Sequence, residues 1–124
     1  MVNTKMINER PHKKLLLWKE AMELVSLIYD VAKHFPKEEE FGLKSQLRRA
    51  AVSVPSNISE GLTRRTNADK IHFLNIADGS LSEIDTQLEI SLRLNILDLE
   101  NFETIEKKIV TVEKLLGGLI RSLR

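Results

Sequence analysis

The stretch Phe41–Gly61, FGLKSQLRRAAVSVPSNISEG, decides the fold of this 124-residue chain. Apolar side chains recur in it at helical spacing and would form one stripe: Leu43, Leu47, Ala50, Ala51, Val54 and Ile58. Because Ala50 and Ala51 are small, a neighbouring helix can come close to them. Pro55 lies inside the pattern, lacks a backbone N–H and crowds the carbonyl of Ala51, so the sequence predicts a kink there. Gly61 then offers a C-terminal stop for the helix.

A polar stripe borders the apolar one in the same stretch and consists of Gln46, Ser53, Asn57 and Glu60. We expect it to face Ser80, Glu83 and Gln87 of the following helix. Two interpretations stay open. In the first, these groups form a buried hydrogen-bond network that fixes the register of the helices or the pairing of subunits. In the second, they line a pocket for a small ligand or an ion.

The composition indicates one soluble globular domain, because 42% of the residues are hydrophobic and 30% are charged. The chain has 19 basic and 18 acidic residues, so its net charge of +1 gives no whole-protein case for nucleic acid. It has no cysteine, which excludes disulfides, thiolate zinc sites and iron–sulfur clusters. No apolar run approaches the 18 residues of a membrane span, so we expect a cytoplasmic protein without a membrane partner.

Periodicity predicts a loose N-terminal arm over residues 1–14 and a four-helix bundle over residues 15–124. The predicted helices are Leu15–Lys33, a second from about 39–43 to 61, Asn67–Leu94, and a fourth from after Asp98 to about Leu123. Thr66 and Asp98 are predicted N-caps. No run is typical of a strand. The predicted fold is therefore all-α, an antiparallel up-down-up-down four-helix bundle with its second helix kinked at Pro55.

The first and third helices carry apolar arcs wider than one core seam needs. A second face of the first helix holds Leu17, Leu24, Leu27 and Val31, and a second face of the third holds Phe73, Ile76, Ser80, Gln87, Ser91 and Leu94. Gly79 lies in the middle of the third helix, where it permits a close backbone approach. Large exposed apolar patches often mark interfaces, so we predict a ring-forming homo-oligomer with these second faces between subunits. The alternative is a monomer whose four-way core uses the broad arcs.

Two segments carry a family resemblance: FPKEEEFGLKSQLRRAAVSVPSNISEG (Phe35–Gly61) and FLNIADGSLSEIDTQL (Phe73–Leu88). Together they resemble the four-helix-bundle family of 23S rRNA intervening-sequence proteins, over about residues 15–123. The block from Ser53 to Gly61 is the most specific, and Ser59 stands there where the family usually has alanine. The resemblance implies a left-handed bundle that often assembles as a homopentamer. The family is also similar to the accessory protein of diversity-generating retroelements, a basic pentameric barrel that binds nucleic acid and partners a reverse transcriptase.

A basic set offers candidate contacts to nucleic acid: Lys44, Arg48 and Arg49 on the second helix, and Arg64 and Arg65 after it. Lysine and arginine can neutralise backbone phosphates. The alternative is a solvated face on which Arg48 and Arg49 pair with nearby carboxylates. The basic N-terminal stretch from Lys5 to Lys19 is a second candidate with the same alternative.

No enzymatic constellation can be assembled from the sequence. The pair Glu9–His12 is interrupted by Pro11, and Asp69–His72 stands alone, so no metal site is predicted. Phosphate-binding glycine loops and a nucleophile elbow are absent, so no catalytic residue or cofactor is predicted. We expect a non-enzymatic oligomeric scaffold that binds RNA, DNA or a nucleic-acid enzyme. The alternative is a structural or protein-interaction module that has no nucleic-acid role and is accessory to another protein.

Overall fold

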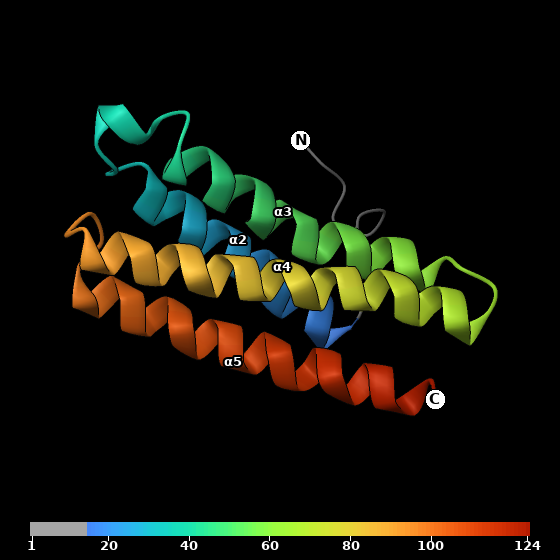
Figure 1. Cartoon of the computed structure of the whole chain (residues 1–124). Helices are drawn as coiled ribbons and strands as arrows, with labels where there is room; N and C mark the ends of the chain where they lie inside the picture. The colour runs from blue at the N-terminus through green and yellow to red at the C-terminus, as the bar shows by residue number, and fades with distance from the viewer. Residues whose placement is uncertain (1–14) are drawn as a thin grey trace, which may run out of the picture.

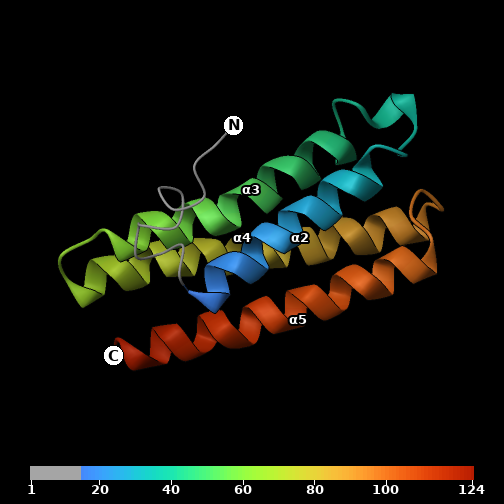
Figure 2. The same cartoon turned by 180° about the vertical axis from the view of Figure 1, so that it is seen from behind.

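The computed structural model describes residues 15–124, which form four α-helices and one short 3₁₀ helix. These are α2 (Leu16–Ala32), η2 (Lys37–Glu39), α3 (Leu43–Leu62), α4 (Asn67–Arg93) and α5 (Leu99–Ser122). Figures 1 and 2 show the long helices side by side, each beginning at the end of the bundle where the preceding one stops. No strand occurs within residues 15–124, so the predicted all-helical fold is confirmed there. The predicted arm and the Glu9–His12 pair lie outside the described residues.

The core runs along the axis of the bundle and takes buried side chains from all four helices. α3 packs against α2 on one side and most extensively against α4 on the other, and α5 contacts both α2 and α4. The apolar stripe predicted for α3 is buried from Leu47 to Ile58. The largest buried side chains are Leu24, Ile28, Leu47, Ile58, Leu74, Leu81, Ile84, Leu88, Ile105, Ile109 and Leu116.

The core-facing sides of α2 and α4 differ from the prediction. Leu17 and Leu24, assigned to a second face of α2, lie in the core, whereas Met22 of the same helix is 41% exposed. On α4, Ser80 and Ser91 of the predicted second face are buried inside the bundle. The core therefore takes residues from both predicted faces of these helices, because a four-way core needs a broad arc from each helix. Much of each predicted intersubunit face belongs to the core.

Two glycines were assigned the wrong roles. α3 does not stop at Gly61 but continues to Leu62, and a Cβ on Gly61 would lie 3.1 Å from the Lys70 carbonyl oxygen. Gly61 therefore allows the backbones of α3 and α4 to approach closely. A Cβ on Gly79 would meet no atom within 4 Å, so the predicted close approach there is not made within the chain.

The predicted helix caps are confirmed. The Asp69 N–H donates to the Thr66 hydroxyl at 3.1 Å, and the Asn101 N–H donates to the Asp98 carboxylate at 2.7 Å. Each bond satisfies a backbone donor that has no partner within its own helix. α3 continues through the buried Pro55, and the kink there stays a prediction.

Candidate functional site

Lys44 and Arg48, two of the predicted nucleic-acid contacts, are engaged within the chain. Lys44 Nζ lies 2.9 Å from a carboxylate oxygen of Glu40, and only 15% of the Lys44 side chain is exposed. This hydrogen bond lowers the pKa of Glu40. The Arg48 guanidinium lies over the Tyr29 ring, 4.9 Å from its centroid, and Arg48 Nε is buried without a hydrogen-bond partner. Neither side chain is therefore free to contact a phosphate group.

Of the other three predicted basic contacts, Arg49 lies apart from the adjacent Arg64 and Arg65. Arg49 is exposed and lines a groove between α3 and α4. Arg64 pairs with Glu60, and its guanidinium lies 4.5 Å from the centroid of the Phe73 ring. Arg65 is exposed and forms no ion pair within residues 15–124. The predicted pairing of Arg48 and Arg49 with carboxylates is absent from the described part of the chain.

Cations nevertheless gather at one end of the bundle. Figures 1 and 2 place the α3–α4 turn and the end of α5 together at that end, whereas α2 begins further inside the bundle. We call its basic residues the positive end: Arg64, Arg65, Lys70, Arg121 and Arg124. Glu60 and Asp69 are the carboxylates nearest the α3–α4 turn, and Glu60 is already paired. The positive end therefore keeps an excess of positive charge that the net charge of the chain conceals.

Carboxylates gather at the opposite end, where η2 and the joint between α4 and α5 lie. We call them the acidic end: Glu38, Glu39, Glu40, Asp98, Glu100 and Glu103. The cations Lys33, Lys37 and Arg93 lie among them, and Lys33 and Arg93 pair with acids on their own helices. Charge is thus separated along the length of the bundle, which favours different partners at its two ends.

The predicted polar stripe forms a groove between α3 and α4. The Ser80 hydroxyl donates to the Ser53 hydroxyl at 2.8 Å, and the Asn57 amide donates to the same Ser53 oxygen at 2.9 Å. Gln87 Nε2 lies 3.5 Å from Gln46 Oε1. The groove has a volume of about 290 Å³ and is lined by Gln46, Arg49, Ala50, Ser53, Ser80, Glu83 and Gln87.

Most of the polar side chains that line this groove have a structural role. Ser80 is buried, and its bond to Ser53 joins α3 to α4 in one register. The exception is Gln87 Oε1, which is buried without a hydrogen-bond partner in the described chain. Glu60, predicted as part of the stripe, instead pairs with Arg64 beyond the groove.

A cluster of carboxylates between α4 and α5 was missed by sequence reasoning. Glu106 hydrogen-bonds to Asp85, and this bond, burial and the nearby carboxylates raise the pKa of Glu106 to about 7. Burial, together with Asp78 and Asp85, raises the pKa of Glu113. The seven-residue spacing from Asp78 to Asp85 and from Glu106 to Glu113 could have indicated the cluster, because residues two turns apart share a helix face.

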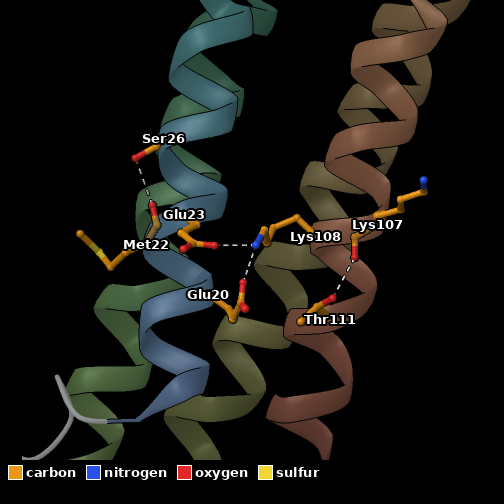
Figure 3. A network of polar contacts seen from close by, with 7 residues as sticks. All are labelled: Glu20, Met22, Glu23, Ser26, Lys107, Lys108 and Thr111. Carbon is orange, nitrogen blue, oxygen red and sulfur yellow. Dashed lines mark hydrogen bonds and ion pairs between the residues drawn. The ribbon is translucent and has the colours of Figure 1, made fainter.

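A second missed network joins α2 to α5 (Figure 3). Lys108 Nζ donates to the carboxylates of Glu20 and Glu23, at 2.6 Å for Glu23. These hydrogen bonds raise the pKa of Lys108 and lower that of Glu23. Lys107, one residue earlier, points away from α2. Successive residues of a helix point in different directions around its axis, so Lys108 faces the bundle while Lys107 is exposed to solvent.

The described chain assembles neither a metal centre nor a membrane span. Within residues 15–124 no three His, Asp or Glu side chains are grouped so that they could hold a metal ion. His72 packs edge-on against Phe73, with ring centroids 5.2 Å apart. None of the helices in this range combines the length and the apolar character that a membrane crossing requires.

Comparisons with known proteins agree on one relationship. A family model described as 23S rRNA-intervening sequence protein matches residues 13–118. A solved structure from Bacteroides thetaiotaomicron, described as a protein of unknown function from the S23 ribosomal protein family, is 27% identical and has a TM-score of 0.79. The alignment covers 85% of this chain and 98% of that one. No curated protein matches the sequence.

Proposed function

The chain belongs to the 23S rRNA-intervening sequence protein family, and from this premise we propose that it is a non-enzymatic, self-associating bundle that contacts nucleic acid. The proposal includes antiparallel helices in a left-handed bundle and copies arranged in a ring, as the resemblance implies. RNA or DNA would be bound at the positive end of each copy, where weak phosphate contacts repeated around the ring would act together.

The separation of charge along the bundle carries the nucleic-acid part of the proposal. The positive end brings together basic residues from two separate segments of the chain, although the chain as a whole is almost neutral. Arg65 is exposed there and has no competing ion pair within residues 15–124. Phosphate contacts need such exposed cations, whereas Lys44 and Arg48 of the predicted set are engaged by Glu40 and Tyr29.

Exposed apolar side chains support self-association. Large hydrophobic residues outside the core are distributed over all four helices and the loop before α3: Leu15, Leu16, Met22, Phe41, Val52, Ile76, Ile90, Leu94, Leu99 and Val110. Two of them, Met22 and Val52, line one apolar groove between α2 and α3, and contiguous apolar surface often marks an interface.

The test is a comparison of two triple variants that lose equal charge at opposite ends. Arg65, Arg121 and Arg124 are changed to Ala in one variant, and Lys33, Lys37 and Arg93 are changed to Ala in the other. Binding to a short structured RNA is measured by fluorescence anisotropy at several salt concentrations. We expect the first variant to bind more weakly, with a salt slope shallower by about 1 per lost contact.

The second triple variant is the matched control, because its net charge changes equally while the positive end stays intact. We expect it to bind as the original chain does. Equal losses in the two variants would show non-localised attraction and would remove the positive end as a site. Light scattering after size-exclusion chromatography measures self-association separately, against a chain mass of 14.2 kDa. A single monomeric mass would contradict the ring.

A second candidate function is a protein-interaction module without a nucleic-acid role. The acidic end favours it, because Phe41, Leu94 and Leu99 are exposed there among carboxylates. Such a surface repels phosphates and suits a protein surface instead. A chain that self-associates but shows no salt-dependent RNA binding would support this function over the first.

A further inference from the structure

Phe41 is the most exposed large apolar side chain in the described part of the molecule. Its relative exposure is 95%, although it directly precedes the first turn of α3. An aromatic ring of this size contributes strongly to binding when a partner covers it.

The turn that presents Phe41 is held by contacts on both sides of it. The Glu39 carboxylate accepts a hydrogen bond from the Leu43 N–H at 3.1 Å, and Glu40 pairs with Lys44 at 2.9 Å. Gly42 leaves the space that Glu39 needs, because a Cβ on Gly42 would lie 2.7 Å from the Glu39 carboxylate oxygen. The ring is therefore displayed from a hydrogen-bonded turn, which lowers the ordering cost of docking it.

An apolar groove between α2 and α3 offers surroundings of matching chemistry for this ring. It has a volume of about 300 Å³ and is lined by Trp18, Met22, Val25, Val52, Pro55, Ser56 and Ser59. Met22 and Val52 are 41% and 42% exposed, so the floor of the groove is accessible. Its lining contains no charged side chain.

The charges around the two surfaces are complementary. Lys19 follows Trp18 at one end of the groove and forms no ion pair within residues 15–124. The nearby acids Glu20 and Glu23 bond to Lys108 on the α5 side of α2 (Figure 3). Glu38 is exposed three residues before Phe41 and, unlike Glu39 and Glu40, pairs with no group within residues 15–124, so a free carboxylate beside Phe41 would meet Lys19.

Phe41 cannot reach the groove of its own chain. α3 is a continuous helix from Leu43 to Leu62, and the groove residues on it begin at Val52. At 1.5 Å per residue, Leu43 and Pro55 are roughly 18 Å apart along the helix axis. A second copy of the chain is therefore the occupant that supplies an aromatic ring with the matching acidic flank.

We propose that Phe41 of one copy inserts into the α2–α3 groove of another copy. This inference rests on the self-association proposed above and names the two surfaces that make it. The contact joins two different surface patches of the chain. Repeated from copy to copy, it can generate a closed ring or an open filament, and formed twice it can join two copies related by a two-fold axis.

The absence of cysteine from the sequence permits a direct test by crosslinking. A Ser45→Cys chain is mixed with a Ser56→Cys chain under mild oxidation, and the mixed disulfide is quantified by mass spectrometry. Ser45 is exposed one helical turn after Phe41, so this variant keeps the Phe41 ring. Leu99→Cys is the matched control, because Leu99 is 58% exposed at the same end of the bundle. We expect the Ser45–Ser56 pair to crosslink at least about 10-fold faster than the Leu99–Ser56 pair. Equal rates, or a predominance of Ser45–Ser45 disulfides, would overturn the proposal.

Association constants supply the second measurement. We expect Phe41→Ala to raise the dissociation constant of the assembly about 10-fold or more, and Leu99→Ala to leave it nearly unchanged. Circular dichroism checks that both variants remain folded. If the original chain is monomeric at every concentration, self-association itself fails. If it assembles and Phe41→Ala assembles equally well, only the Phe41 contact is wrong.

Discussion

Gly61 and Gly79 show how differently one residue type is used in neighbouring helices. At Gly61 the missing side chain lets the α4 backbone approach, and a Cβ would also lie 3.2 Å from Phe73 Cβ. At Gly79 the added carbon would meet open space. The sequence shows a glycine in each helix but not which atoms lie opposite, so the two roles could not be assigned from the pattern.

Replacing each glycine by alanine should change stability in opposite directions. We expect Gly61→Ala to lower the free energy of unfolding by about 1–3 kcal/mol, because the methyl group meets backbone that cannot move freely. We expect Gly79→Ala to raise it by roughly 0.5–1 kcal/mol through helix propensity. Urea denaturation measures both. A loss at Gly79 as large as that at Gly61 would contradict the open surface described there.

The polar residues were predicted unequally well. Ser53 and Ser80 lie at helical spacing beside the apolar stripes, and the structure brings their hydroxyls together. The contact of Arg48 with Tyr29 could not be predicted, because helical periodicity does not specify where a long side chain ends. The same limit explains why Lys108 was not linked to Glu20 and Glu23.

At the scale of elements, the contact between α4 and α5 combines an apolar seam with a carboxylate cluster beside it. Ile105, Ile109 and Val112 of α5 are buried, whereas Glu106 and Glu113 of the same helix face Asp85 and Asp78. No ion pair joins α4 to α5 within residues 15–124. The two helices are therefore held by apolar contact against electrostatic repulsion.

This repulsion makes stability depend on pH. The pKa of Glu106 is about 7 in the folded chain, above the ordinary value of 4.5, so the folded state binds this proton more tightly. The free energy of unfolding should therefore fall as pH rises from about 4.5 to about 7. We expect Glu106→Gln to be more stable than the original chain at about pH 8, by on the order of 1 kcal/mol after allowing for solvent screening.

Chemical denaturation at about pH 5.5 and about pH 8 checks the prediction for Glu106. The stability difference between the two pH values should shrink in Glu106→Gln, with the remainder due to Glu113. Glu100→Gln is the control, since Glu100 is exposed on the first turn of the same helix. Parallel pH profiles for the original chain and Glu106→Gln would show that the carboxylates do not interact as described.

At the scale of the whole molecule, helix positions were predictable and charge placement was not. The predicted helices begin and end within a few residues of the observed ones, because caps such as Thr66 and Asp98 mark their limits. The positive and acidic ends arise only when the turns place distant segments together. The net charge adds all charges regardless of where they lie. The value of +1 therefore does not reveal that one end of the bundle is positive and the other acidic.

Self-association should make thermal stability depend on protein concentration. If copies bury apolar surface such as Phe41 and Val52 against each other, only folded chains associate, and the unfolding temperature rises with concentration. Differential scanning calorimetry at two concentrations about 30-fold apart should show this rise, and Phe41→Ala should reduce it. A concentration-independent midpoint in the original chain would indicate a monomer.

The separation of charge between the two ends also has a kinetic consequence. A nearly neutral molecule with opposite charge at its ends has an electric dipole moment along its length, so a polyanion exerts a torque on it before contact. The bundle would rotate during diffusion and arrive with Arg65 leading and Phe41 trailing. Encounter geometry would thus be selected before any short-range bond forms, and the trailing end would remain available to another molecule.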